Sequence, residues 1–474
     1  MARAARTAER EPTIVRGQRW PDLDVPQLGT WTPTQSVCVV LPARDCQDEL
    51  DRTLASLAQQ TYPSDLTELV VVDDASTVPL RLPRDRPAHT RLLTLEDAPG
   101  HGSGRARHAG ASVTEAEVVL FIDADMVVDR WHVEAHARWH HVTPHAVVLA
   151  HKWFVDFAGI TPAQVSAATA AGDIEGMVTG RRRRRHEWHE EFVAAQDELT
   201  RERTDAFLAV VGASVSIRAD LYERSGGFAS FGLRGIVDTE FGYRAFTAGA
   251  LLVPDREAVA YHQGVRNFAR SGATEIKRMR TGLAANHLPI DLFRPANTGR
   301  QWAVPMMHVV VDVGGASPEE VQVTTDSVLA SNFTDLAVTV TTEHSAPLPT
   351  WVSDYFSHEP CVSFTTSVVK SGFPSPMSAA IPAGLMVGVD TLRRAIDLVR
   401  ENQIGILRTN PDDLEGRSLE VWSTRAVLRS THPEVDDVYG RAAELFGERW
   451  VPSERLGVRP VAFEVTKQGM LALQ

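Results

Sequence analysis

Two continuous apolar runs with a helical pattern between them constrain the fold more than any other feature of the sequence. The runs lie in SVCVVLP (36–42) and LTELVVVDDAS (66–76), and they are apolar at successive rather than alternating positions, as in strands covered on both faces. Three leucines recur between them at helical spacing: Leu50, Leu54 and Leu57. Asp45 is expected as the N-cap of this helix. The order predicts a β-α-β unit, which pairs its strands in parallel.

The same alternation continues as far as residue 123. TRLLTLE (90–96) reads as a strand, the alanine-rich RARHAGASVTEA (105–116) as a helix, and EVVLFID (117–123) as a further strand. The fold class predicted is therefore α/β, with a Rossmann-like, mostly parallel open sheet.

Acidic residues stand at the carboxyl ends of two expected strands. Asp73 and Asp74 end one, and Asp123 and Asp125 follow the other. Ligands of open α/β sheets bind beyond the carboxyl ends of the strands, so these carboxylates are expected to converge on a ligand crevice.

The pair in FIDADM would face one ligand if the strand continues through Asp125, because side chains at i and i+2 share a face. Adjacent desolvated carboxylates repel, and a divalent cation resolves the conflict. Magnesium takes one or two carboxylates and completes its shell with water and phosphate oxygens. The alternative is that Asp123 caps the next helix and Asp125 is a solvated turn residue.

The chain is too long for one core, and it is expected to form three parts. A proline-punctuated connection, LPIDLFRPANTGRQWAVP (288–305), predicts a boundary. Residues 307–345 then weakly repeat the strand-helix-strand order of residues 36–76, with Thr342 and Glu343 where the first copy has its paired aspartates. The expected parts are an N-terminal extension, a first α/β domain and a second, reduced α/β domain: 1–35, 36–295 and 296–474.

Composition excludes several classes of protein. A net charge of −13 argues against a general nucleic-acid binder, which needs a basic face. Three scattered cysteines exclude a disulfide framework and suit a reducing cytoplasm. The start lacks the apolar core of a signal peptide, and no uncharged apolar run approaches the length of a membrane span. A cytoplasmic chain is expected, and peripheral contact with the inner membrane face stays open.

An ordered series of motifs resembles the family 2 glycosyltransferases, which have the GT-A fold. In order, the motifs are SVCVVLPARD, TLASLAQQTYP, VVVDDAS, RARHAGA, VVLFIDADM, GASVSIRADLYERSGGF, VDTEFGYRAFTAGA and YHQG, between residues 36 and 264. Such a series is more specific than any single motif. The resemblance implies a metal-dependent, inverting transferase that uses Mn²⁺ or Mg²⁺. It would move a sugar from a nucleoside-diphosphate donor, expected to be a UDP-sugar, to a hydroxyl of a glycan or glycolipid.

The resemblance also assigns roles to residues of this sequence. Asp125 and His262 would hold the metal, and Asp238 would be the catalytic base. The remaining positions would bind the nucleotide-sugar: Pro42, Asp74, Arg107, Asp123, Gly226 and Gly227. Taken alone, His262 reads as an ordinary strand-end histidine, and the two glycines read as a turn.

One position departs from the family pattern. The family usually has Glu-Asp where this sequence has Val237-Asp238, and the missing acid often helps to bind the acceptor. Glu240 could replace it if the segment is extended. If the segment is helical, with Phe241 and Ala245 facing inward, Glu240 points elsewhere.

Residues 172–205 are dense in charge and are expected to form an exposed helical or mobile insertion. Its RRRRR run (181–185) could attract an anionic acceptor or the membrane surface, but the neighbouring glutamates favour a solvated charged face. His186 and His189 could share a metal, although HEWHEE is not the H-E-x-x-H motif of metalloproteases. PGHGSG (99–104) is expected to be a flexible turn.

Two functions other than sugar transfer are considered for this sequence. A non-catalytic nucleotide- or glycan-binding scaffold is favoured by Val237 and by the second domain, which is similar to a degenerate GT-A half without metal acids. A nicotinamide dehydrogenase is disfavoured, because PARDCQDEL lacks the glycines that admit a pyrophosphate. The second domain is expected to pack on the first, to mediate homodimerisation or to bind acceptor. The Arg- and Ala-rich composition is compatible with a bacterial source and with cell-wall or polysaccharide synthesis.

Overall fold

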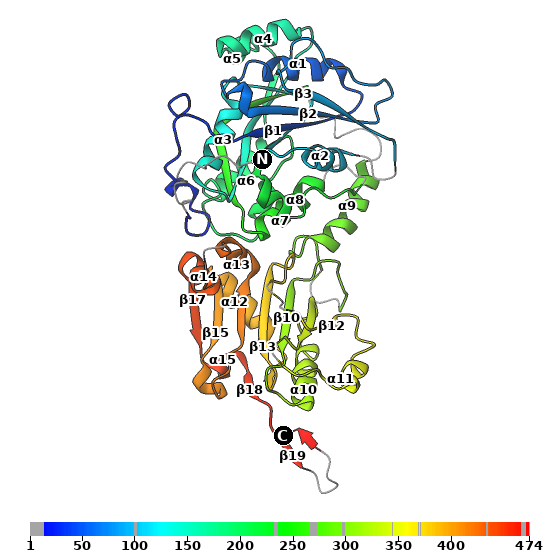
Figure 1. Ribbon diagram of the computed structural model, residues 1–474, viewed down its shortest axis with the longest axis vertical. Coiled ribbons are helices and arrows are strands. Elements are labelled where there is room, and N and C mark those ends of the chain that lie inside the picture. Colours follow the sequence, from blue (N-terminus) through cyan, green and yellow to red (C-terminus); the bar gives the residue numbers. More distant parts are fainter. Residues whose placement is uncertain are drawn as a thin grey trace, which may run out of the picture. The chain divides into compact units, whose positions relative to one another are not determined.

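The computed structural model describes residues 14–98, 102–231, 236–264, 273–295, 299–343, 345–367, 369, 371–432, 435–465 and 471–473. The chain divides into two compact units, Met1–Phe246 with Ala250–Leu283, and Thr247–Gly249 with Ala284–Gln474 (Figure 1). The boundaries predicted from the sequence stay predictions. Parts of the predicted extension (1–13), of the turn in PGHGSG (99–101) and of the boundary connection (296–298) lie outside the described residues.

The first unit is built on a nine-stranded sheet with the order β3-β2-β1-β4-β8-β6-β9-β5, and β7 pairs with β6. Its strands are β1 (Val37–Ala43), β2 (Thr67–Asp74), β3 (Thr90–Leu95), β4 (Val118–Ile122), β5 (Met126–Val128), β6 (Ala146–Val155), β7 (Arg183–Arg185), β8 (Ser214–Arg218) and β9 (Leu251–Gln263). Strands β3, β2, β1 and β4 are parallel neighbours, and β6 and β9 form a further parallel pair. Strands β8, β7 and β5 run against their neighbours. The predicted mostly parallel α/β sheet is confirmed.

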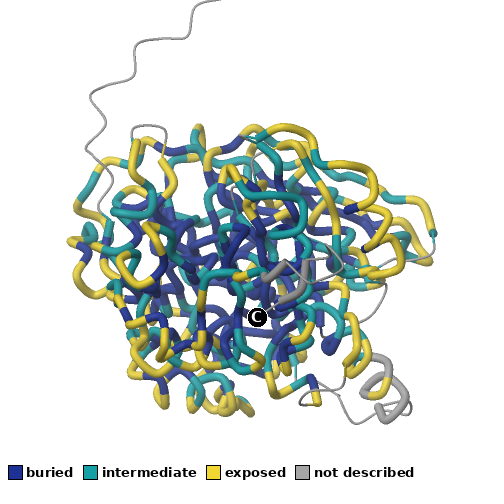
Figure 2. Tube along the Cα trace, turned by 90° about the horizontal axis from the view of Figure 1, so that it is seen from below, coloured by how far each residue is buried: buried dark blue, intermediate teal, exposed yellow. Residues whose placement is uncertain are grey.

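Helices join and cover these strands in the first unit. They are η1 (Trp20–Asp22), α1 (Gln47–Leu57), η2 (Ser64–Leu66), α2 (Ser103–Ala111), α3 (His132–Val142), α4 (Pro162–Ala171), α5 (Ile174–Met177), α6 (Glu187–Ala195), η3 (Ala206–Ala209), α7 (Ala219–Arg224) and α8 (Val237–Thr247). Helix α9 (Ala273–His287) contains residues of both units. The leucines predicted to line α1 are buried and belong to the same core cluster as residues of β1, β2 and β4. In Figure 2 the buried parts of the chain are dark blue, and they lie in the interior.

The predicted N-cap of α1 is wrong. Cys46 occupies that position, and its side chain makes no capping hydrogen bond. Asp45 has a φ of 49°, and its Oδ1 accepts a hydrogen bond from Thr77 N at 2.7 Å. Its carboxylate therefore ties the start of α1 to the turn that follows β2.

The second unit has its own seven-stranded sheet, with the order β12-β11-β10-β13-β16-β15-β17. Its strands are β10 (Met307–Asp312), β11 (Leu336–Thr341), β12 (Val362–Thr365), β13 (Met377–Pro382), β14 (Leu385–Val387), β15 (Ile406–Thr409), β16 (Glu420–Ser423), β17 (Glu448–Val451), β18 (Val458–Pro460), β19 (Phe463–Val465) and β20 (Leu471–Leu473). Its helices are α10 (Pro318–Leu329), α11 (Thr350–Tyr355), α12 (Thr391–Asn402), η4 (Pro411–Leu414), α13 (Thr424–Ser430), α14 (Val438–Phe446) and α15 (Ser453–Leu456). The predicted second α/β domain is confirmed.

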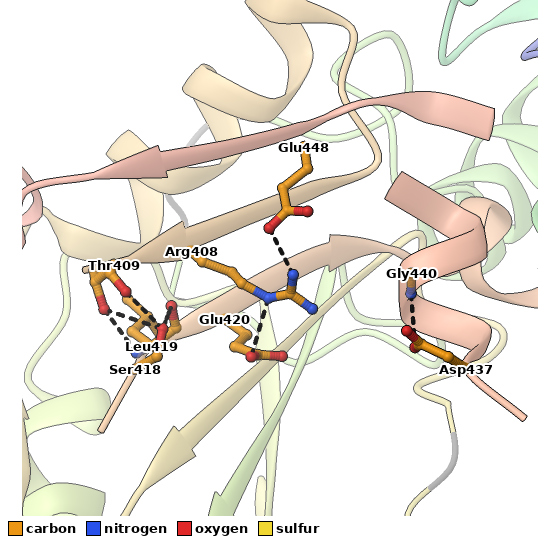
Figure 3. A network of polar contacts seen from close by, with 8 residues as sticks. All are labelled: Arg408, Thr409, Ser418, Leu419, Glu420, Asp437, Gly440 and Glu448. Atoms are coloured by element: carbon orange, nitrogen blue, oxygen red, sulfur yellow. Dashed lines mark hydrogen bonds and ion pairs between the residues drawn. The ribbon is translucent and has the colours of Figure 1, made fainter. Parts of the chain in front are cut away.

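A half-buried arginine connects β15, β16 and β17 of this second sheet (Figure 3). Arg408 on β15 donates to Glu420 on β16 at 3.1 Å and to Glu448 on β17 at 2.6 Å. Beside it, Leu419 N donates to Thr409 Oγ1 at 2.8 Å. Burial lowers the pKa of Arg408, but the two glutamates outweigh that effect and raise it. The network satisfies the charges at the join of three strands, which is a structural role.

Three histidines of α3 in the first unit pack against two serines of β8. His132, His136 and His140 are four residues apart along the helix, and Ser214 and Ser216 are two apart along the strand. Four residues of a helix span about 6 Å, and two residues of a strand span about 6.6 Å. The histidines and the serines therefore have nearly the same spacing. Hydrogen bonds of 2.8–3.2 Å therefore connect neighbouring rungs in an unbroken ladder.

These ladder histidines are neutral in the folded chain. Burial lowers the pKa of His132 to about 4 and that of His140 to about 3, and it lowers the pKa of His136 well below its usual range. The unfolded chain binds protons near the ordinary histidine pKa, whereas the folded chain does not until lower pH. Stability contributed by neutral histidines is thus fully present above about pH 6.5 and is lost as the pH falls towards 4.

We expect His140→Gln to reduce the pH dependence of stability. Between pH 7 and pH 5 the variant should lose about 2 kcal/mol less free energy of unfolding than wild type, because one group that protonates only on unfolding is gone. Urea unfolding followed by circular dichroism at both pH values measures this difference. His141→Gln, at the exposed neighbouring position, is the control and should behave as wild type. Equal pH dependence in His140→Gln and wild type would contradict the assignment.

Candidate active site

The side chain of Arg107 joins two of the predicted site carboxylates. Arg107 lies on α2, is only 2% exposed, and points towards the turn after β4 and the start of α8. Its guanidinium donates to Asp238 Oδ1 at 2.9 Å, to Asp123 Oδ1 at 2.6 Å and to the carbonyl of Gly212 at 3.0 Å. Burial lowers the pKa of Arg107, but the two carboxylates outweigh burial and raise it. The guanidinium therefore stays charged and fixes both acids.

The D-x-D pair does not lie on a strand. Strand β4 ends at Ile122 and β5 begins at Met126, so Asp123 and Asp125 occupy the turn between them. The condition that the strand continues through Asp125 is not met, and Asp125 lies in a turn, as in the alternative, so alternation along a strand does not orient the pair. The two carboxylates instead have separate partners, Arg107 for Asp123 and His262 for Asp125.

Asp125 and His262 form the second pair of the site. Strand β9 places His262 opposite Met126 of β5, next to the turn, and Gln263 N donates to the Asp125 carbonyl at 2.9 Å. This pairing brings His262 Nε2 to 3.2 Å from Asp125 Oδ2. Within the described residues, no group of three or more His, Cys, Asp or Glu side chains is placed to hold a metal. The pair thus offers one carboxylate and one imidazole.

Asp74 is nearly buried at the end of β2, where it contacts the start of α2. Its Oδ2 accepts a hydrogen bond from Gly102 N at 2.7 Å, and its Oδ1 lies 3.6 Å from Arg105. Pro42 lies on β1, paired with Val72 of β2. Both residues are at the carboxyl end of the parallel strands, where the sequence places the ligand crevice.

Gly226 and Gly227 follow α7 with φ values of +77° and +61°, a region that favours glycine. The turn is held by Arg244 of α8, which donates to the carbonyl of Gly227 at 2.6 Å and to that of Ser225. Arg244 also pairs with Glu240 at 2.6 Å, and Glu240 is 3% exposed. Because α8 is helical, Glu240 points away from Asp238, as expected for that alternative. It cannot replace the acid missing at Val237.

Val237 itself is buried against α2. A Cβ added to Gly104 would lie 2.6 Å from Val237 Cγ1, so the two helices approach closely at this point. The position where the family usually has glutamate is therefore part of the apolar packing between α2 and α8.

The charged insertion is not wholly helical or exposed, in contrast to the expectation. Arg183–Arg185 form β7, which pairs with Trp153, Phe154 and Val155 of β6 and so joins the main sheet. His186 and His189 stack on each other with ring centroids 5.2 Å apart, and His189 Nε2 donates to the Ala209 carbonyl at 2.8 Å. Burial lowers the pKa of His189 to about 4.

Gly212 is a site residue that the sequence analysis missed. A Cβ at this position would lie 2.4 Å from Asp238 Oδ1 and 2.7 Å from Arg107 Cζ. Only a glycine admits the Arg107–Asp238 pair at this distance from the chain. A glycine at the entrance to a strand signals close approach by another group, and that signal was present in VVGAS.

We expect Gly212→Ala to separate Arg107 from Asp238. Leaving a buried guanidinium without one partner should cost on the order of 3 kcal/mol of unfolding free energy. Gly282→Ala is the matched control, because a Cβ there meets no atom within 4 Å and alanine favours the helix. Thermal and urea unfolding of both variants checks the prediction, and equal stabilities would contradict it.

Part of the chain is similar to known glycosyltransferases. Residues 38–198 match the family described as Glycosyl transferase family 2. The chain is 29% identical over 245 residues to validoxylamine A glucosyltransferase of Streptomyces hygroscopicus subsp. limoneus, covering 49% of this chain and 52% of that protein. It is 29% identical over 112 residues to 4,4'-diaponeurosporenoate glycosyltransferase of Staphylococcus haemolyticus (strain JCSC1435), covering 22% of this chain and 29% of that protein. The chain thus spans about half, or less, of these curated relatives.

Two solved structures are similar at lower identity. The mannosyltransferase PcManGT from Pyrobaculum calidifontis, in complex with GDP-Man and Mn²⁺, is 18% identical, with a TM-score of 0.37, 57% of this chain covered and 67% of the other. S. aureus TarS 1–349, in complex with UDP-GlcNAc, is 17% identical, with a TM-score of 0.38, 54% of this chain covered and 68% of the other. No helix among the described residues is long and apolar enough to cross a membrane. The similarity to the family described as Glycosyl transferase family 2 thus lies within the first unit, over residues 38–198.

Proposed function

We propose that the chain is a metal-dependent, inverting glycosyltransferase. It moves a sugar from a nucleoside diphosphate, expected to be UDP, to a hydroxyl of a glycan or glycolipid, in cell-wall or polysaccharide synthesis. The observation that carries the proposal is the arrangement in which Arg107 bridges Asp123 and Asp238 beside the Asp125–His262 pair. At the carboxyl end of the sheet, the fixed guanidinium of Arg107 suits a diphosphate, and the Asp125–His262 pair suits the metal ion that accompanies it.

The metal ligands in this proposal are Asp125 and His262. Asp125 Oδ2 and His262 Nε2 are 3.2 Å apart, and the Asp125 side chain is 35% exposed, so both atoms can turn to one ion. Two protein ligands suit Mg²⁺ or Mn²⁺, which keep water and phosphate oxygens in the remaining positions. When bound, such an ion acts as a Lewis acid and stabilises the charge on the departing diphosphate.

The nucleotide-sugar lies along the edge formed by Pro42, Asp74, Asp123 and the Gly226–Gly227 turn. In this proposal Asp123 contacts the ribose, and Arg107 contacts the diphosphate or the base. Because Arg107 is already held by two carboxylates and a carbonyl, its position is preorganised before a ligand arrives. Arg244 is a positioning residue, since it holds the glycine turn through two carbonyls.

Asp238 acts as the general base. Arg107 contacts its Oδ1 alone within the described residues, which leaves Oδ2 able to take a proton. The acceptor hydroxyl oxygen bonds to the anomeric carbon as its proton passes to Asp238 Oδ2. The bond from the anomeric carbon to the diphosphate oxygen breaks with its electron pair on the diphosphate. Attack opposite the leaving group inverts the anomeric configuration.

The second unit is, in this proposal, a degenerate GT-A domain, with the chain divided at residues 36–295 and 296–474. The second sheet has the same arrangement of strands as the first. Its order β12-β11-β10-β13-β16-β15-β17 corresponds to β3-β2-β1-β4-β8-β6-β9, and each pair of neighbours is parallel or antiparallel in both sheets alike. Strand β14 pairs antiparallel with β18, as β5 pairs with β9. Strand β13 ends at Pro382 and is followed by the turn Ala383-Gly384 before β14, whereas the turn between β4 and β5 is Asp-Ala-Asp. Loss of both acids removes the metal ligand, which leaves acceptor binding or homodimerisation as its role.

A non-catalytic scaffold that binds nucleotide or glycan is the second candidate. The observation that favours it is Val237, buried where the family usually carries an acid that helps to bind acceptor. Binding without turnover would support it over transfer.

We expect one of the two nucleotides, UDP or GDP, to bind only when Mn²⁺ is present. Asp125→Asn should abolish this Mn²⁺-dependent binding, because a metal ligand is lost. Isothermal calorimetry with and without Mn²⁺ measures both effects. Asp220→Asn removes an exposed carboxylate of α7 in the same unit and is the matched control. No nucleotide binding by wild type under any condition would overturn the proposal and favour the glycan-binding scaffold.

We expect Asp238→Asn to bind nucleotide as wild type does but to turn over the donor about 10²–10⁴-fold more slowly, the usual contribution of a general base. The amide oxygen can still accept from Arg107, so the variant should keep its fold. Release of nucleoside diphosphate from a panel of donor sugars measures the rate. Wild-type turnover by Asp238→Asn would show that another group takes the proton.

A further inference from the structure

We propose that Thr53 of α1 is a positioning residue for the metal ligands Asp125 and His262. Its hydroxyl is hydrogen-bonded both to the residue that precedes Asp125 and to the residue that follows His262, and it thereby sets the separation of the carboxylate and the imidazole. This inference rests on the proposed function, because it assigns a further residue to the same metal site.

The Thr53 hydroxyl lies between the two chain segments that carry the metal ligands. It donates to the Ala124 carbonyl at 2.8 Å, in the turn between β4 and β5. It accepts a hydrogen bond from Gln263 Nε2 at 3.1 Å, at the end of β9. Ala124 directly precedes Asp125, and Gln263 directly follows His262. One side chain therefore contacts the immediate neighbour of each proposed ligand.

The direction of these hydrogen bonds is fixed by the other partners of the Gln263 amide. Its Nε2 also donates to the Glu49 carbonyl at 2.9 Å, and its Oε1 accepts from Arg52. A carbonyl can only accept and a guanidinium can only donate, so the amide nitrogen must face Thr53. The Thr53 oxygen thus accepts from the amide, and its single hydrogen is turned towards the Ala124 carbonyl.

Strand pairing connects the same two segments a second time. Gln263 N donates to the Asp125 carbonyl at 2.9 Å, and His262 pairs with Met126 of β5. The segments are therefore held together by the backbone of β5 and β9 and by the Thr53 hydroxyl. The backbone bonds fix the register of the strands, and the hydroxyl fixes the turn that leads into β5.

Burial makes this hydroxyl difficult to replace. Thr53 is fully buried and Ala124 is only 4% exposed, so water does not substitute for the lost donor where the turn stands now. A buried carbonyl without a donor is costly, and the turn regains a partner only by moving towards solvent, which displaces Asp125. Helix α1 does not follow such a movement, because Leu50 and Leu54 anchor it in the core.

Ser56 of the same helix offers a matched comparison. It is fully buried and lies one turn after Thr53. Its Oγ accepts from Val128 N at 3.1 Å and donates to the Thr53 carbonyl at 2.8 Å. Val128 is the last residue of β5, so this contact ties α1 to the far end of the strand that begins after the turn. Loss of the Ser56 hydroxyl thus removes a comparable buried contact without removing the hydrogen bond to the turn.

The test measures Mn²⁺ affinity in the full chain for wild type, Thr53→Val and Thr53→Ser. Mn²⁺ is titrated with excess UDP or GDP, whichever binds wild type, and unbound Mn²⁺ is followed by its electron paramagnetic resonance signal. The same nucleotide concentration without protein gives the background. We expect Thr53→Val, which keeps the shape but lacks the hydroxyl, to weaken Mn²⁺ binding about 10–100-fold. Thr53→Ser keeps the hydroxyl and should restore binding to the wild-type level.

Ser56→Ala is the matched control. Urea unfolding should show that Thr53→Val and Ser56→Ala are both less stable than wild type, because each loses a buried hydrogen bond, but only Thr53→Val should lose Mn²⁺ affinity. Gln263→Met tests the same link from β9, at a half-buried position, and should also weaken Mn²⁺ binding even if Thr53→Val does not fold.

Wild-type Mn²⁺ affinity in folded Thr53→Val or in Gln263→Met would overturn the positioning role and leave the proposed function standing. Equal loss of Mn²⁺ affinity in Thr53→Val and Ser56→Ala would also overturn it, because a general loosening of α1 would then be the cause. Nucleotide binding by wild type that does not depend on Mn²⁺ would instead overturn the metal site of the proposed function, and this inference with it.

Discussion

The ion bridge made by Arg107 is the interaction on which the rest of the site depends. A buried guanidinium is costly unless each face finds a partner, and Arg107 finds Asp123, Asp238 and the Gly212 carbonyl. These three partners come from the turn after β4, the start of α8 and the entrance to β8. The bridge therefore fixes three segments that are distant in sequence, and with them the acids proposed for the ribose and for proton transfer.

Small residues and neutral histidines make this charged centre compatible with a packed unit. Gly212 leaves space for the bridge, and Gly104 lets α2 approach Val237 of α8. On α3, the His132–His136–His140 ladder forms its hydrogen bonds with serines rather than carboxylates. The ladder itself is therefore uncharged, whereas the same helix also carries a buried ion pair, in which Arg138 donates to Asp255 of β9 at 2.7 Å. Below about pH 6.5 that neutrality becomes costly to maintain.

The second unit shows how the same topology persists without the site. Its sheet repeats the strand order and directions of the first, and it contains a half-buried ion network with a structural role, Arg408 with Glu420 and Glu448. The parallel β-α-β core requires only continuous apolar strands and amphipathic helices, which both units have. The two aspartates in the turn after the fourth strand are an addition to that core, and the second unit has Ala383 and Gly384 in the corresponding turn.

Sequence by itself determined the α/β class, the helix α1 with its buried leucines, the second α/β domain and the order of the acidic motifs. These follow from local hydrophobic periodicity, which reports how a strand or helix is covered. Only the tertiary structure decided that Asp123 and Asp125 lie in a turn, that Arg107 reaches Asp238, and that Thr53 lies between Ala124 and Gln263. Strand pairing and helix packing bring together residues more than a hundred positions apart, and no local pattern records which of them meet.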